Sequence, residues 1–200
     1  MSETPRIEVT VAAPVEDVWD AMRNKEKIRH WHGWEDPTLE QEIDVIYFSD
    51  FSEDGHTLTL NGGGGGTFEL TPDGDGTRLT MTRAPRGVSP EWDAYYDDIT
   101  EGWTTFLHQL KFALERHPGE KRRTLFHMGQ GLVPFTVPGE TFFKSANQHG
   151  VVVPEWGDGL LITGYNAEKD QSMAVLTIYG FSDAELEALA GKYGLTVVPG

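Results

Sequence analysis

The stretch from Ser89 to His117 is the longest amphipathic pattern in this chain of 200 residues. Ser89 can cap a helix, and Pro90 suits its first turn. At about 100° per residue, one arc of this predicted helix holds its large apolar side chains: Trp92, Tyr95, Tyr96, Ile99, Trp103, Phe106, Leu107, Leu110, Ala113 and Leu114. Such a helix must lie along a large apolar surface, and only a sheet elsewhere in the chain can provide one.

Alternating apolar residues predict the strands of that sheet. The expected strands are residues 6–12, 42–51, 57–60, 67–71 and 77–83. Segment 42–51 is apolar on both faces, which is typical of a strand covered on two sides. The Asp-Gly steps between Asp73 and Gly76 favour a tight turn, so we expect antiparallel hairpins.

Two short helices are predicted between the first two strands. Pro14 suits a first helical turn, and Val15, Val18 and Met22 then share one face. Residues 25–31 form the second helix, which ends before Gly33.

A run of five glycines, Gly62–Gly66, invites comparison with a phosphate-binding loop. Such a loop needs a following Lys-Ser or Lys-Thr pair and a helix. Here a predicted strand follows instead, so we interpret the run as a flexible connector.

The charge of the chain excludes some function classes. Acidic residues outnumber basic ones 32 to 16, which gives a net charge of -16. This charge repels nucleic-acid backbones and anionic membranes. There is no cysteine, which excludes disulfides and thiolate chemistry. No apolar stretch is long enough for a membrane helix and no signal-peptide pattern is seen, so a cytoplasmic protein is expected.

Residues 120–200 are expected to form a smaller β-rich extension. Strands are predicted at 150–153, 159–165 and 173–179, a helix with a capping box begins at Ser182, and a last strand covers Leu195 to Val198. The segment 151–161 echoes 68–78, including a Gly-Asp-Gly step. The extension could be a degenerate half-repeat of the first domain, or the echo could reflect turn chemistry alone.

Four blocks of the sequence resemble a known superfamily: Ile7–Ala21, Lys27–Trp31, Gly74–Thr82 and Glu101–Leu107. In this order they are similar to the START-like superfamily, also called SRPBCC, and most of all to its branch named for the activator of the heat-shock-protein-90 ATPase. The resemblance covers residues 6 to about 117. It implies an α+β helix-grip fold, in which a curved antiparallel sheet wraps around a long carboxy-terminal helix, with two short helices, over residues 1–119.

The resemblance leaves two features to explain. The family usually has an additional hairpin before the strand predicted at 57–60, and this sequence leaves no room for it. Phe112 and His108 lie on the otherwise polar side of the long helix, where an isolated domain should carry polar groups. We therefore expect residues 120–200 to dock there and complete the first domain.

Catalytic patterns are weak. His30 and His32 with Glu35 and Asp36 do not have a zinc-site spacing. Asp97, Asp98 and Glu101 could perform acid–base chemistry if buried, but carboxylates near a helix start have an electrostatic explanation. No Gly-x-Ser-x-Gly element is present. No cofactor and no metal are therefore expected.

The leading hypothesis is binding of a small apolar or aromatic molecule in a cavity between the sheet and the long helix, because members of the superfamily mostly bind such molecules. The expected lining is Trp31, Trp34, Tyr47, Tyr96, Trp103 and Phe106, with His117 near the mouth. One alternative is an enzyme of the polyketide cyclase, dehydratase or hydrolase kind that uses a pocket carboxylate or histidine. A module that activates a chaperone ATPase is the least favoured, and a homodimer is left open.

Overall fold

The computed structural model describes residues 3–199. The chain divides into two compact units by its internal contacts. The amino-terminal unit comprises residues 1–33 and 38–119, and the carboxy-terminal unit comprises residues 34–37 and 120–200. Each unit is described by itself.

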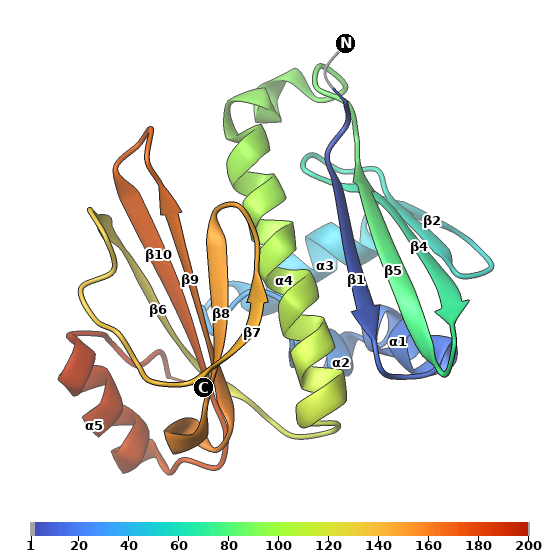
Figure 1. The fold of residues 1–200 in the computed structure, drawn as a ribbon. Coiled ribbons are helices and arrows are strands. Elements are labelled where there is room, and N and C mark those ends of the chain that lie inside the picture. The colour runs from blue at the N-terminus through green and yellow to red at the C-terminus, as the bar shows by residue number, and fades with distance from the viewer. Residues whose placement is uncertain (1–2, 200) are drawn as a thin grey trace. The chain divides into compact units, whose positions relative to one another are not determined.

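The amino-terminal unit contains one antiparallel sheet of five strands in the order β1-β5-β4-β3-β2 (Figure 1). The strands are β1 (Arg6–Val11), β2 (Phe51–Asp54), β3 (Thr57–Leu60), β4 (Gly66–Asp73) and β5 (Gly76–Arg83). The predicted hairpin is confirmed, because Asp73 pairs with Gly76 across the turn. Gly74 in that turn has a φ of 61°, a conformation that glycine adopts without strain.

The long helix is confirmed as α4 (Tyr96–Arg116), but its predicted start is wrong. Residues Pro90–Tyr95 form a 3-10 helix, η1. A 3-10 helix turns by 120° per residue, so its side chains leave the arc that an α-helix would give them. Trp92 and Tyr95 are accordingly 45% and 57% exposed. Farther along, Trp103, Leu107 and Leu110 join the buried core of the sheet.

The short helices after β1 are α1 (Val15–Arg23) and α2 (Lys25–Ile28). The Asn24 side chain caps α2 by accepting a hydrogen bond from the Glu26 amide. The helix ends three residues earlier than predicted. Trp31 and His32 still donate their backbone amides to the Ile28 carbonyl, at 3.1 and 2.8 Å, so the chain continues as a turn.

The strand predicted at 42–51 is wrong. Residues Leu39–Phe48 form a helix, α3, and the strand β2 begins only at Phe51. The buried side chains Leu39, Ile43 and Tyr47 recur every four residues, which is a helical and not a strand spacing. Val45, expected inside the sheet, is 58% exposed.

The glycine run is a packed turn and not a loose connector. The Gly64 carbonyl accepts a hydrogen bond from the Trp103 indole at 3.0 Å, and the Gly65 carbonyl accepts one from Arg83 at 3.3 Å. A Cβ atom on Gly63 would lie 1.9 Å from the Trp92 indole nitrogen. Glycine therefore permits a close approach of side chains to the backbone here.

The carboxy-terminal unit contains a second antiparallel sheet, in the order β6-β10-β9-β8-β7 (Figure 1). Its elements are β6 (Arg123–Gln130), β7 (Glu140–Lys144), β8 (Gln148–Val153), the 3-10 helix η2 (Pro154–Trp156), β9 (Gly159–Asn166), β10 (Gln171–Ile178) and α5 (Asp183–Tyr193). The three predicted strands and the capping box are confirmed. Its core includes Leu125, Trp156 and Leu176 from the sheet side and Leu186 from α5.

The last predicted strand is wrong, because Leu195 to Val198 form no strand. Gly194 ends α5 in the left-handed conformation, with a φ of 67°. The Leu195 amide then bonds back to the Ala190 carbonyl at 2.8 Å. Leu195 and Val197 pack against the core of the unit as side chains on an irregular segment.

Candidate functional site

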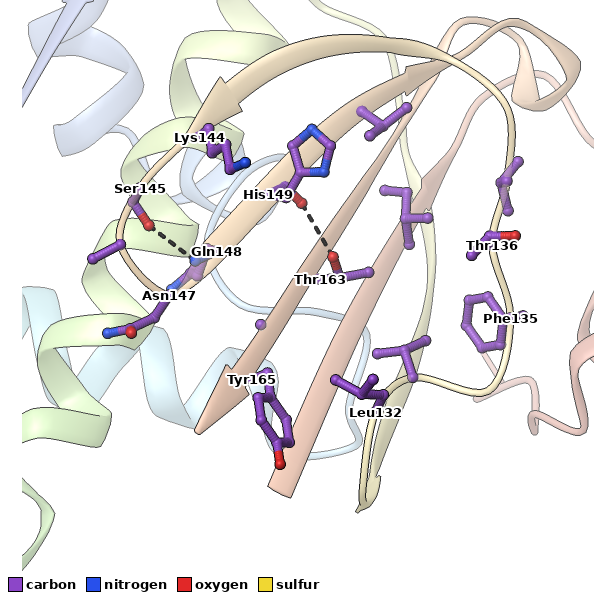
Figure 2. A pocket seen from close by; sticks show the side chains of 16 residues that line it. Leu132, Phe135, Thr136, Lys144, Ser145, Asn147, Gln148, His149, Thr163 and Tyr165 are labelled. Carbon is purple, nitrogen blue, oxygen red and sulfur yellow. Dashed lines mark hydrogen bonds between the residues drawn. The ribbon is translucent and has the colours of Figure 1, made fainter. Parts of the chain in front are cut away.

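A cavity of about 510 Å³ lies within the carboxy-terminal unit. It is formed by the face of strands β8 and β9, the turn between β7 and β8, and the connection between β6 and β7 (Figure 2). A volume of this size is within the range of small-molecule sites.

The floor of the cavity comes from alternate residues of two paired strands. In the register of β8 and β9, His149 faces Thr163 and Val151 faces Leu161. Side chains of directly paired residues lie on the same side of a sheet, so these four share one face. The Val-rich β8 segment forms a strand because branched side chains pack well on a pleated surface. The floor is thus apolar at Val151 and Leu161 and polar at His149 and Thr163.

Residues 131–139, which we call the strap, form the opposite wall. Val133, Phe135 and Val137 are half-buried and pack on the core, whereas the residues between them are exposed. Pro134 and Pro138 have no amide hydrogen, which disfavours a regular strand here. The strap is therefore held mainly by its side chains, and the Phe135 ring lies 4.5 Å from the Tyr193 ring.

The turn between β7 and β8 closes one end of the cavity. The Ser145 amide donates to the Gln148 carbonyl at 2.9 Å, and the Gln148 amide donates to the Ser145 hydroxyl at 3.0 Å. The Tyr165 amide also donates to the Asn147 carbonyl at 3.2 Å. These bonds fix the backbone that carries the polar lining.

His149, Tyr165 and Lys144 are three of the polar side chains that line the cavity. A ring nitrogen of His149, Nε2, lies 2.9 Å from the Thr141 hydroxyl. The Tyr165 hydroxyl donates to Asp170 at 2.8 Å, and this hydrogen bond raises the pKa of Tyr165. Lys144 supplies a positive charge. Tyr165 therefore stays protonated at neutral pH and offers a neutral hydroxyl.

The structure places the residues predicted as lining in several locations. Trp31, Tyr47, Trp103 and Phe106 come together in the amino-terminal unit. Tyr96 is the first residue of α4, and His117 follows its last residue, so a helix about 30 Å long separates them. Trp34 belongs to the carboxy-terminal unit, where it stacks on Phe126 with ring centroids 3.9 Å apart.

A buried histidine lies at the centre of this aromatic cluster. His32 Nδ1 is 2.9 Å from the Tyr47 hydroxyl, and its Nε2 is 3.0 Å from a Glu42 carboxylate oxygen. The Phe106 ring centroid lies 4.5 Å from that of His32. Burial, followed by the charge of Glu42, raises the pKa of Tyr47 well above its ordinary value of 10.0. The unit thus holds a hydrogen-bonded chain from an acid through an imidazole to a phenol.

Sequence reasoning missed the cavity of the carboxy-terminal unit. The sequence nevertheless contains a signal. Val133, Phe135 and Val137 alternate with other residues in segment 131–139, which begins and ends with glycine and contains two prolines. An apolar alternation without strand chemistry indicates a segment that covers an apolar surface and does not extend a sheet.

Among residues 3–199, no helix is both long and apolar enough to cross a membrane. No protein-family model and no curated protein matches the chain. Among solved structures, DynU16 from the dynemicin biosynthetic locus is 16% identical over 94% of this chain and 93% of its own, with a TM-score of 0.41.

Two further solved structures are similar to this chain. An AHSA1-like protein from Rhizobium etli is 24% identical over 72% of this chain and 95% of its own, with a TM-score of 0.43. The di-domain ARO/CYC StfQ from the steffimycin biosynthetic pathway is 13% identical over 96% of this chain and 89% of its own, with a TM-score of 0.38.

Similarity at this level assigns no function. The architecture of this chain is established by its own strand order and by the helix that packs on the sheet. The amino-terminal unit is therefore an α+β helix-grip domain, as the resemblance to the START-like superfamily predicted.

Proposed function

We propose that this protein binds a small apolar or aromatic molecule, and that the cavity beneath the strap is its site. The observation that carries the proposal is the cavity of about 510 Å³, which has apolar residues on its floor and strap and several polar residues among its lining. Ligand sites in proteins combine these features, because apolar walls supply affinity and a few polar groups fix orientation.

The construction of the strap supports the same conclusion. A strap that packs through Val133, Phe135 and Val137 on one core surface can shift without breaking a ladder of hydrogen bonds. Leu132, at its start, is 73% exposed and lines the cavity. An apolar side chain at this place gains burial when a ligand occupies the cavity.

The test uses the fluorescent probe N-phenyl-1-naphthylamine, which is neutral and brightens in apolar sites. The full-length protein is expected to bind it saturably. Thr163→Trp places a large ring in the cavity and is expected to abolish this binding. Thr196→Trp makes the same change at an exposed position outside the cavity and is expected to leave it intact. Equal binding by wild type and Thr163→Trp would contradict the site.

Acid–base catalysis is a second candidate function, and the chain Glu42–His32–Tyr47 favours it. A buried imidazole with a carboxylate on one nitrogen and a phenol on the other resembles the arrangement of general acid–base groups. The predicted lining residues Trp31, Trp103 and Phe106 surround it. A ligand that reacts here must contact the imidazole.

NMR can separate the two sites. Addition of the same neutral probe is expected to shift signals of β8 and β9. Shifts in the His32 ring signals would place a ligand in the aromatic cluster. Unchanged His32 signals at saturation would mean that the probe does not contact the hydrogen-bonded groups Glu42, His32 and Tyr47. That result would count against the catalytic candidate.

A further inference from the structure

One end of the cavity beneath the strap contains a pair of nitrogen-bearing side chains from neighbouring strands. Lys144 and His149 are directly opposite in the register of β7 and β8. Directly opposed residues in an antiparallel pair have their side chains on the same face, with Cβ atoms about 5 Å apart. Both line the cavity, and Figure 2 shows them at the same end of it.

These two side chains have donor capacity to spare. Among residues 3–199, Lys144 has no ion-pair partner. His149 uses Nε2 for its contact with Thr141, and within the same described range Nδ1 has no partner. An ammonium and an imidazole side by side can both bond one acceptor group.

The charge at the cavity contrasts with that of the whole chain. Acidic residues outnumber basic ones 32 to 16 over the sequence, yet no Asp or Glu is among the residues that line the cavity, and Lys144 is the charged residue there. Asp170 accepts a hydrogen bond from the hydroxyl of the lining residue Tyr165. A cavity with this lining disfavours a cationic ligand and favours an anionic one.

The number of charges limits the kind of anion. A phosphate group is a dianion at neutral pH and is usually held by several cationic or backbone donors. One ammonium and one imidazole match a monoanion better. The apolar floor residues Val151 and Leu161 can then contact the apolar part of the ligand.

We infer that the strap cavity binds an amphipathic organic acid, whose monoanionic head group is held by Lys144 and His149 and whose apolar or aromatic body lies beneath the strap. This inference rests on the proposed binding function and specifies its ligand class. Carboxylates and sulfonates share the chemistry that this pair recognises.

A matched pair of probes tests the charge. N-phenyl-1-naphthylamine is neutral, and 1-anilinonaphthalene-8-sulfonate is the same skeleton with a sulfonate. The wild-type protein is expected to bind the sulfonate more tightly. Lys144→Met is expected to weaken sulfonate binding about ten-fold, because a charge-assisted hydrogen bond is lost, and to leave binding of the neutral probe unchanged.

Three controls define the site. Lys144→Arg retains the charge and is expected to restore the preference for the sulfonate. Lys121→Met removes a positive charge at an exposed residue outside the cavity and is expected to have no effect. Thr163→Trp is expected to abolish binding of both probes. Added salt should weaken binding of the sulfonate probe more than binding of the neutral probe, because salt screens the charge of Lys144.

The outcomes separate the two proposals. One outcome is that Thr163→Trp abolishes binding of both probes whereas Lys144→Met has no effect. This outcome would overturn the anionic ligand class and retain the binding function. Equal losses in Lys144→Met and Lys121→Met would show a general charge effect and would also overturn the inference. If neither probe binds at the cavity, the proposed function itself fails.

Discussion

The two units of this protein have sheets with the same strand order but different coverings. In each, the first strand pairs with the fifth, and the fourth, third and second follow. The amino-terminal unit inserts α1, α2 and α3 between its first and second strands, whereas the carboxy-terminal unit has only the strap there. The first unit has an aromatic cluster in its interior and the second has a cavity.

In the first unit the covering residues form a packed aromatic cluster, and in the second they leave the cavity that we propose as the site. Large rings such as Trp31, Tyr47 and Trp103 fill space and satisfy their polar atoms inside the first unit. The strap offers smaller side chains on a single extended segment, so it covers only part of its sheet.

The shared order also bears on the half-repeat hypothesis. The sequence echo matches segment 68–78, in the β4–β5 hairpin, with segment 151–161, in β8–β9. Strand order instead makes β9–β10 the equivalent of β4–β5. The echo is therefore not evidence for the half-repeat, and turn chemistry remains an alternative explanation of it. The shared strand order supports the half-repeat, which stays a proposal. Docking of the extension on α4 likewise stays a prediction.

The largest expected effect is from Trp103→Ala, which would introduce a cavity into the packed unit. Trp103 is 4% exposed and contacts Phe68 and Phe106. A loss of about 3–5 kcal/mol in the free energy of unfolding is expected, measured by hydrogen exchange of α4 and β5 amides. Trp92→Ala makes the same change at an exposed residue, and a similar loss there would contradict the assignment of the core.

Tyr47→Phe tests whether the aromatic cluster depends on its polar chain. The change leaves His32 Nδ1 without the phenol that lies 2.9 Å from it. We expect a loss of about 2 kcal/mol, the cost of an unsatisfied buried polar atom, in urea unfolding. Tyr95→Phe is the exposed counterpart and should be neutral. Neutrality of both variants would show that the chain adds nothing to stability.

Phe135→Ala tests the strap as a cover. Phe135 is half-buried and contacts Tyr193 and His127, so a loss of about 1–2 kcal/mol is expected. Hydrogen exchange of β8 and β9 should accelerate, and binding of the neutral probe should weaken. Leu132→Ala, at an exposed strap residue, is expected to keep stability. Unchanged probe binding in Phe135→Ala would remove the strap from the site.

The smallest expected effect concerns the helix that follows the last strand of the carboxy-terminal unit. Ser182 and Glu185 form a capping box at α5, and Ser182→Ala is expected to cost about 1 kcal/mol. Glu185 accepts hydrogen bonds from the hydroxyl and the amide of Ser182, and these bonds lower the pKa of Glu185 below its ordinary value of 4.5. The folded pKa is therefore below the unfolded one, so this contribution is present above pH 4.5 and is lost as pH falls below it. Urea unfolding at several pH values should show this loss in wild type and a smaller loss in Ser182→Ala, in which the backbone amide of residue 182 can still donate to Glu185.

Part of the fold could be predicted because local chemistry and tertiary structure agree. The Asp73-Gly74 turn, the Ser182 capping box and the α4 apolar face follow from short-range rules. The strand prediction over segment 39–48 was wrong because the apolar residues there fit both a period of two and a period of four. The segment 90–95 failed because 3-10 and α-helices share capping signals.

The site was harder to predict than the fold. The aromatic residues of the amino-terminal unit were identified, but whether rings line a cavity or fill a core depends on gaps between elements that no periodicity encodes. The strap was missed because its residues form no regular element. Lys144 and His149 become neighbours only through the register of β7 and β8.

The sequence by itself determined the α+β class, the long helix, four strands of its sheet, three strands of the extension and the acidic character of the chain. Those properties follow from side-chain periodicity, turn residues and net charge, which are local or summed quantities. Only the tertiary structure revealed the cavity beside β8 and β9, because a cavity is a small difference between volumes contributed by distant segments. It also placed a lysine and a histidine together at the end of that space, because cross-strand register is fixed by the folded sheet.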